Sequence, residues 1–181
     1  MNDAATHAQR AQFSIQRTYV VSREEAWALW TTKPGIESWW GPEGFEVTVT
    51  ALDLRVGGEM TYLMTAVAPG MVAFMKGANM PISTPCKVTY TEISAPNRLA
   101  YKTLTDFVPD VEPYHISTLV ELTATGEGVE MTITFDAMHD EDWTERARAG
   151  HESQLCKLDA LLGRERREID RSDAGLASQR G

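Results

Sequence analysis

The stretch that decides the fold is residues 140–163, which read DEDWTERARAGHESQLCKLDALLG. Apolar or weakly polar side chains recur in it at intervals of three and four residues, the spacing of one helix face. This stripe consists of Trp143, Ala147, His151, Leu155, Leu158 and Leu162. Asp140 can cap the start of a helix and Gly163 can close its end. The pattern therefore predicts one long helix between them.

The chain that precedes this helix is predicted to consist mainly of strands. Residues 13–21 alternate between apolar and polar side chains, as half-buried strands do. Ser22 and Glu25 have capping-box spacing and open a short helix, and one further helical turn fits between Pro34-Gly35 and Gly41-Pro42. Alternating segments separated by turn residues then predict a mostly antiparallel meander of about six strands. These segments are residues 45–56, 59–67, 85–94, 98–105, 114–125 and 129–138.

This order of elements predicts an α+β domain, in which a curved antiparallel sheet wraps around the long C-terminal helix and two short helices follow the first strand. A long sheet curls as it twists, so a helix laid across it leaves a concave gap. Gaps of this kind bind small ligands. The domain is expected to span residues 13–163. Residues 1–12 and 164–181 contain few apolar side chains, so we expect a flexible N-terminus and a flexible or frayed C-terminal tail.

Composition and charge exclude several functional classes. Apolar residues make up 43% and charged residues 24% of the chain, which is usual for a globular protein. The formal net charge of -9 disfavours a nucleic-acid partner, because such binding relies on clustered Lys and Arg. No apolar run approaches the ~20 residues that span a bilayer, and the start lacks the apolar centre of a signal peptide. We therefore expect a cytoplasmic protein that binds neither nucleic acid nor membranes.

The sequence offers no metal-binding motif, cofactor motif or activated nucleophile. Cys86 and Cys156 are far apart, and the four His residues do not cluster at ligand spacing. No GxSxG motif is present. Gly57-Gly58 precedes a strand, whereas a phosphate-binding glycine loop precedes a helix. We expect neither a metal nor a cofactor, and we assign no catalytic residue.

Several motifs together resemble a known family. They are Arg17 and Tyr19 on the first strand, Trp27 and Trp30 on the first helix, residues 36–45 (IESWWGPEGF) and residues 53–58 (DLRVGG). With the closing helix, they resemble the homologues of the heat-shock-protein-90 ATPase activator, within the SRPBCC superfamily of START-like and birch-pollen-allergen-like proteins. The resemblance covers residues 13–163 and implies the helix-grip fold. Superfamily relatives include lipid carriers, hormone receptors and cyclases, so the resemblance implies a cavity and no particular chemistry.

The sequence departs from the family pattern in two places. Family members usually carry a Gly-Trp pair in the closing helix, where this chain has Gly150-His151. The connection at residues 68–84 (APGMVAFMKGANMPIST) is longer and richer in Met than is usual. Met adapts to variable apolar shapes, so this Met-rich loop is interpreted as a lid over the cavity or, alternatively, as a homodimer contact.

The candidate cavity residues come from residues 39–42, which we call the WWGP motif, and from the strands, the Met-rich loop and the helix stripe. Trp39 and Trp40 are interpreted as core or as an aromatic wall of the cavity, two roles that do not exclude each other. His151 is either a hydrogen-bonded core residue or a ligand contact. The full set is Trp39, Trp40, Phe45, Tyr62, Met64, Phe74, Tyr101, His115, Trp143, Ala147, His151 and Leu155.

Three functions are compatible with these patterns. The first is a carrier or sensor that binds a small hydrophobic or aromatic molecule in the cavity. The second is a cyclase-like or dehydratase-like enzyme that uses His151, Tyr62, Tyr101 or His115 for proton transfer. The third, a module that modulates a chaperone ATPase, follows only from the name of the family. At least two polar groups that converge on one point in the cavity would favour the enzyme.

Overall fold

The computed structural model describes residues 10–178 except residues 107 and 109, with side chains up to residue 163. The strands in this part of the chain are β1 (Gln12–Tyr19), β2 (Phe45–Leu52), β3 (Glu59–Ala66), β4 (Ser83–Ser94), β5 (Arg98–Thr105), β6 (Tyr114–Ala124) and β7 (Val129–Asp136). The helices are α1 (Arg23–Thr31), α2 (Lys33–Trp39), α3 (Pro69–Gly77) and α4 (Glu141–Ser178).

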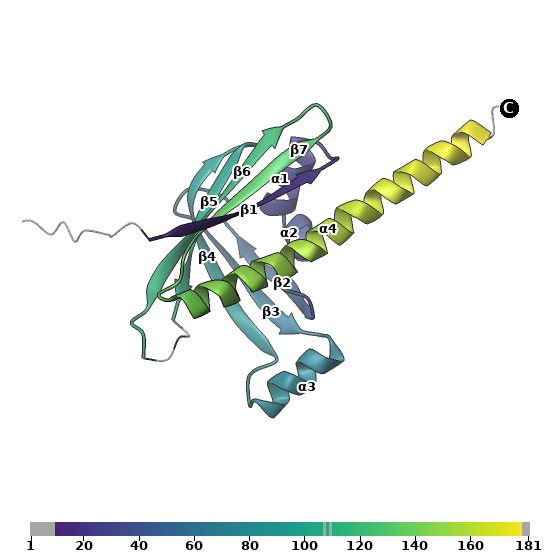
Figure 1. Cartoon of the computed structure of the whole chain (residues 1–181). Coiled ribbons are helices and arrows are strands. Elements are labelled where there is room, and N and C mark those ends of the chain that lie inside the picture. Colours follow the sequence, from purple (N-terminus) through teal and green to yellow (C-terminus); the bar gives the residue numbers. More distant parts are fainter. Residues whose placement is uncertain (1–9, 107, 109, 179–181) are drawn as a thin grey trace, which may run out of the picture.

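The strands form one antiparallel sheet in the order β1-β7-β6-β5-β4-β3-β2. β1 pairs with β7, so the first strand joins the last strand of the meander. The sheet curls around the first part of α4, and α1 and α2 lie beside it (Figure 1). The predicted α+β helix-grip architecture is therefore confirmed, including the two short helices after the first strand.

Side-chain caps set the starts of two helices where the sequence predicts them. The Ser22 hydroxyl accepts a hydrogen bond from the Glu25 N–H at 3.1 Å, and the Glu25 carboxylate accepts one from the Ser22 N–H at 2.7 Å. The carboxylate of Asp140 accepts a hydrogen bond from the Trp143 N–H at 2.7 Å and caps α4. Each cap satisfies a backbone donor that would otherwise have no partner at a helix start.

Two predictions about helices are wrong. Gly163 does not end α4, whose backbone continues to Ser178 and projects beyond the sheet (Figure 1). Glycine lowers helix propensity by about 1 kcal/mol relative to alanine but does not block a helix, and strong helix formers follow it here. The Met-rich loop contains the helix α3, which begins at Pro69, because proline is tolerated in the first turn of a helix. That residues 164–181 are flexible stays a prediction.

The hydrophobic core lies between the inner face of the sheet and α4. Leu155, Leu158 and Leu162 are buried there, which confirms that the predicted stripe faces the sheet. The indole rings of Trp30, Trp39 and Trp40 pack edge to face at the same level, with centroids 4.7, 5.4 and 5.3 Å apart. This aromatic cluster closes the side of the core formed by α1 and α2.

Candidate functional site

Burial along the inner face of the sheet is uneven. At one end most inner positions on β2 to β6 are only half-buried, although Ala66 and Thr105 at that end are buried. On β6 the burial falls from Val120 and Thr118, which are buried, to Ile116, which is half-buried. The same change occurs on β4 from Val88 to Cys86. The half-buried inner positions at this end are Phe45 on β2, Tyr62 and Met64 on β3, Thr84 and Cys86 on β4, Thr103 on β5, and Tyr114 and Ile116 on β6. We call this end of the inner face the open end. At the opposite end, Leu52 and Ile93 are also half-buried.

The helix stripe becomes more buried along its length. Trp143, Ala147 and His151 are half-buried, whereas Leu155 and the later members of the stripe are buried. The first turns of α4 therefore lie over the open end, and the later turns lie over the core.

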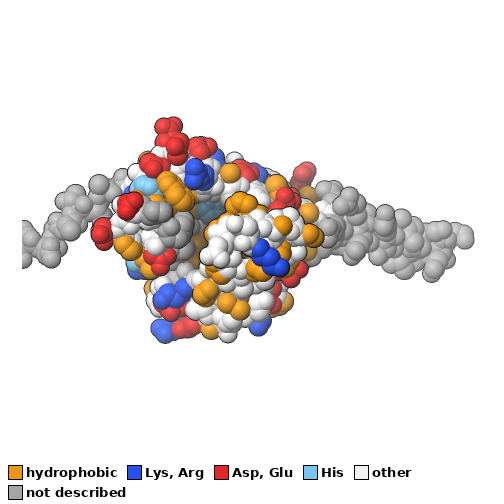
Figure 2. Space-filling view, turned by 90° about the horizontal axis from the view of Figure 1, so that it is seen from below, with side chains coloured by type: hydrophobic (Ala, Val, Ile, Leu, Met, Phe, Trp, Pro, Cys, Tyr) orange, Lys and Arg blue, Asp and Glu red, His pale blue; other side chains and the backbone are white. Residues whose placement is uncertain are grey.

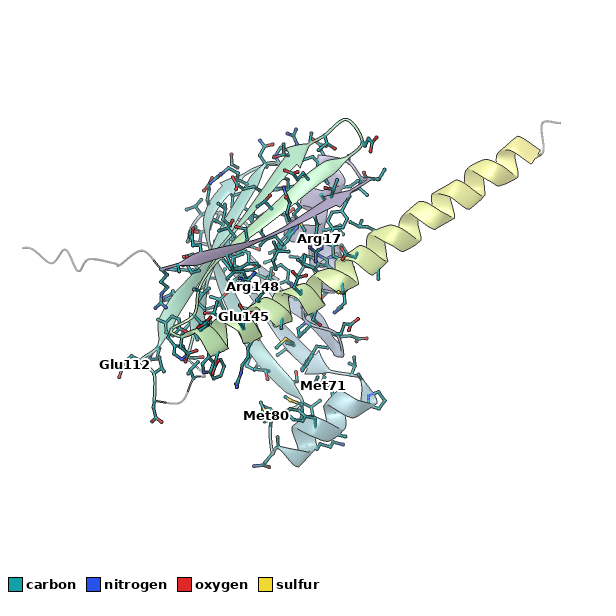
Figure 3. The ribbon with its side chains drawn as sticks, viewed as in Figure 1. Arg17, Met71, Met80, Glu112, Glu145 and Arg148 are labelled. Carbon is teal, nitrogen blue, oxygen red and sulfur yellow. The ribbon has the colours of Figure 1, made fainter. Side chains whose placement is uncertain are left out.

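The surface is hollowed at the open end. Seen from below, a hollow lies between the lobe formed by α3 and the connection from β5 to β6 (Figure 2). Figure 3 shows Met71 and Met80 on the α3 side of this end and Glu112 on the other, with Glu145 and Arg148 at the start of α4. We call this depression the hollow. Along the helix stripe, the boundary between half-buried and buried residues lies between His151 and Leu155.

A small recess lies at that boundary, between α4 and the aromatic cluster. Its volume is about 10 Å³, about what one water molecule requires. Two half-buried polar side chains of α4, His151 and Gln154, contribute to its wall. The complete lining is Trp30, Trp39, Tyr101, Ile133, Phe135, His151, Gln154 and Leu155.

The imidazole of His151 is held by ring contacts. It stacks on the ring of Phe135 with the centroids 3.6 Å apart and the planes at 23°, and the ring of Phe13 lies 6.3 Å away. Burial lowers the pKa of His151 to about 4, because the charged form loses its hydration. The side chain is therefore neutral at neutral pH.

Two tyrosines place hydroxyl groups on the inner face near the recess. Tyr62 is half-buried on β3, and burial, followed by the neighbouring Cys86 thiol, raises its pKa well above the usual range. Tyr101 is buried on β5, and burial likewise raises its pKa, although a hydrogen bond with Thr118 lowers it again in part. Both phenols keep their protons at neutral pH and can serve as hydrogen-bond donors.

The WWGP motif is tied to the closing helix by one lysine. The ammonium of Lys157 donates hydrogen bonds to the carbonyl oxygens of Trp40 and Phe45, at 3.1 and 3.0 Å. Burial lowers the pKa of Lys157, while Glu46 and Glu43 raise it again in part. The lysine fixes the segment that carries the aromatic cluster against α4.

Most of the predicted cavity residues lie together, and two do not. Trp39, Trp40 and Leu155 are buried beside the core, and Phe45, Tyr62, Met64, Tyr101, Trp143, Ala147 and His151 lie on the inner face or on the stripe that covers it. Phe74 on α3 is 63% exposed. His115 is exposed on the outer face of β6, because its neighbours Tyr114 and Ile116 occupy the inner positions. Neither belongs to the hollow.

Other side chains that no sequence pattern assigned to the cavity, among them Gln154, Thr103 and Cys86, also face the recess or the open end. Gln154 could have been found from its spacing, since it follows His151 by three residues on one helix face. Thr103 and Cys86 occupy inner positions set by strand register, which the sequence pattern did not resolve. No group of three or more His, Cys, Asp or Glu side chains among the described residues could hold a metal ion.

The fold and the hollow define an α+β helix-grip domain of a ligand-binding type. Residues 20–163 match the family described as Activator of Hsp90 ATPase homolog 1-like protein, and the chain belongs to this family. No helix within the described part of the chain is long and apolar enough to cross a membrane.

Solved structures of similar fold come from several bacteria. Protein CV1439 from Chromobacterium violaceum is 21% identical, with a TM-score of 0.67 over 83% of this chain and 96% of that chain. A protein from Arthrobacter aurescens is 23% identical, with a TM-score of 0.67 over 84% and 86%. The AHSA1 protein from Silicibacter pomeroyi is 19% identical, with a TM-score of 0.65 over 86% and 99%. The comparison with curated proteins gives no match. At these identities the likeness supports the fold alone.

Proposed function

We propose that this protein is a carrier or sensor that binds a small hydrophobic or aromatic molecule in the hollow between the open end of the sheet and α4. The observation that carries the proposal is the cluster of half-buried inner side chains at the open end. Side chains such as Met64, Ile116 and Trp143 remain half-buried at the open end, although they are apolar. A ligand that covers them would remove apolar surface from water, which stabilises a complex by about 25 cal/mol per Å² before the costs of association.

The lining of the hollow suits a ligand with an apolar body. Apolar and aromatic side chains predominate, and a few hydroxyl, amide and imidazole groups provide orientation, as is typical of small-molecule sites. The proposed contacts are Tyr62, Met64, Tyr101, Trp143, Ala147 and His151, with Trp39, Trp40, Phe45 and Leu155 as the supporting wall. Phe74 and His115 are withdrawn from this set, since they are exposed away from the inner face.

The convergence of His151, Gln154 and Tyr101 on one recess favours a second candidate, an enzyme of the cyclase or dehydratase type. A general base works best when its pKa lies near the operating pH. The low pKa of His151 makes it a weak base, and Tyr101 retains its proton. These groups are therefore better suited to hydrogen bonding than to proton transfer, and binding is the function that we propose first.

Two neighbouring residues on β5 provide a test. Thr103 is half-buried at the open end, whereas Leu104 is 43% exposed on the outer face. Thr103→Trp should fill the hollow and abolish binding of the apolar dye Nile red, while Leu104→Trp should leave it unchanged. Fluorescence titration measures both, and thermal melting confirms that each variant is folded. Equal binding by both variants would place the dye outside the hollow and contradict the proposal.

A further inference from the structure

The inner face of the sheet is nearly free of charge, in contrast to the outer face. Of the described inward-facing positions on the seven strands, Arg17 on β1 alone carries a charged side chain. The helix stripe of α4 contains no Lys, Arg, Asp or Glu side chain. The outer positions of the strands include Glu46, Glu59, Lys87, Arg98, Lys102, Glu121, Glu130 and Asp136. The half-buried residues at the open end are thus accessible and yet uncharged.

The cations near the inner face each contact a neighbouring group. The guanidinium of Arg10 lies 4.1 Å from the ring centre of Tyr114, and that of Arg146 lies 5.2 Å from the ring centre of Trp143. Arg17 pairs with Glu152 and lies 3.6 Å from the carboxylate of Asp159, and Figure 3 shows it well separated from Met71 and Met80 at the opening. Lys157 donates to two backbone carbonyls. The guanidinium of Arg148 lies 4.5 Å from the ring of Phe13 and 3.3 Å from a carboxylate oxygen of Glu145.

The recess, by contrast, holds polar groups without partners. Among the described residues, neither the imidazole of His151 nor the amide of Gln154 forms a hydrogen bond, although both line the same recess. Each side chain can both donate and accept. The polar atoms of both side chains keep some access to solvent. A ligand that supplies a hydrogen bond can therefore take the place of water at these groups.

We propose that His151 and Gln154 form a polar anchor for an uncharged ligand, which places a single hydroxyl or carbonyl group in the recess and its aromatic or apolar body in the hollow. This inference rests on the proposed function and names its ligand class. The recess has room for one such group. A neutral imidazole next to an amide can pair with either a hydroxyl or a carbonyl oxygen.

A carboxylate ligand fits this site poorly. It would lose its hydration in a recess that no Lys or Arg side chain lines. Arg17, the one cation among the described inner strand positions, is already paired. The low pKa of His151 also means that the imidazole does not supply a positive charge at neutral pH. Burial of an ion without a partner is strongly unfavourable, so the site should discriminate by charge as well as by shape.

Three probes with the same naphthalene body test the anchor by isothermal titration calorimetry of the full chain at neutral pH. We expect 2-naphthol to bind most tightly, naphthalene more weakly, and 2-naphthoate at least about tenfold more weakly than 2-naphthol. In His151→Phe the stack on Phe135 is retained and both nitrogens are lost, so the advantage of 2-naphthol over naphthalene should shrink. His115→Phe, on the outer face, is the matched control and should behave as the wild type.

The outcomes separate this inference from the proposed function. Binding of 2-naphthoate as tight as that of 2-naphthol would overturn the uncharged-ligand inference and leave the proposed hollow intact. An undiminished preference of His151→Phe for 2-naphthol would overturn the role of His151. Lack of binding by all three probes would overturn both. Should His151→Phe fail to fold, the imidazole resonances of the wild type in NMR spectra must shift with 2-naphthol, and their constancy would equally contradict the anchor.

Discussion

The imidazole of His151 lies stacked on the ring of Phe135, with the two centroids 3.6 Å apart. This contact joins α4 to β7 at the point where the helix stripe changes from half-buried to buried. It holds one polar side chain of the helix stripe in a fixed position beside the recess. Stability, pH dependence and ligand choice should therefore all respond to changes at this residue.

The first prediction concerns pH. The pKa of His151 is about 4 in the folded protein, against an ordinary value of 6.5. Between these two pKa values, His151 binds a proton in the unfolded state but not in the folded state. The contribution of neutral His151 to the free energy of unfolding is therefore complete above pH 6.5 and is lost as the pH falls toward 4. We expect a loss of about 2–3 kcal/mol. Urea melts over this range should show a steeper pH dependence for the wild type than for His151→Phe.

The surroundings of His151 do not confound this test. Tyr101, which lines the same recess, stays protonated over the range because burial raises its pKa. Arg148 lies across the ring of Phe13 from the imidazole. Glu152, the next residue on α4, is paired with Arg17. His115→Phe, on the exposed outer face, should retain the pH dependence of the wild type. Parallel curves for the wild type and His151→Phe would show that His151 is not buried in its neutral form.

The second prediction concerns the packing of α4 on the sheet. Leu158 is 1% exposed, so Leu158→Ala should leave a cavity and lower the free energy of unfolding by about 2–5 kcal/mol. The exposed Ala160 provides a control, and Ala160→Ser should change stability by less than about 0.5 kcal/mol. Urea denaturation gives both values. A loss at Leu158 as small as that at Ala160 would mean that this face of the helix does not pack against the core.

The fold could be predicted from sequence because its signals are local. The capping box at Ser22, the alternation within each strand and the stripe on α4 each depend on residues a few positions apart. The candidate site could be predicted only in part. Trp39 and His151 belong to clear motifs. The position of Gln154 in the recess and the inward orientation of Thr103, by contrast, follow from tertiary packing and from strand register. His115 was misplaced because a shift of one residue moves a strand side chain to the other face.

The third prediction concerns the contact between Lys157 and the WWGP motif. Lys157→Met should keep most of the aliphatic packing and remove both hydrogen bonds, leaving the carbonyls of Trp40 and Phe45 without this donor. We expect a loss of about 1–3 kcal/mol of stability. Cys156→Ala, at the exposed neighbouring position, should be nearly neutral. A stable Lys157→Met protein with unchanged tryptophan fluorescence would show that the lysine does not hold this segment.

The fourth prediction separates the two interpretations of the Met-rich loop (residues 68–84). Phe74 is 63% exposed and Met80 is 49% exposed, so the lobe around α3 presents apolar side chains to solvent. If the segment is a dimer contact, Phe74→Ser combined with Met80→Ser should convert a dimer into a monomer in light scattering. If it is a lid, the mass should stay constant and Nile red should dissociate faster. A variant that changes neither mass nor dissociation rate would exclude both roles.

The fifth prediction concerns the tail. Residues 164–181 have few apolar side chains, so truncation after Gly163 should lower the melting temperature by no more than a few degrees. The truncated and full-length chains can be compared by calorimetry. A larger fall would show that the distal part of α4 packs against the domain or against a second copy.

Native mass spectrometry of the full chain purified from its own host tests most directly whether the hollow holds a small apolar molecule. We expect a second species heavier than the apoprotein by the mass of one small molecule, retained in Leu104→Trp and lost in Thr103→Trp. Apoprotein alone in the wild type, or a bound molecule that persists in a folded Thr103→Trp protein, would contradict the account.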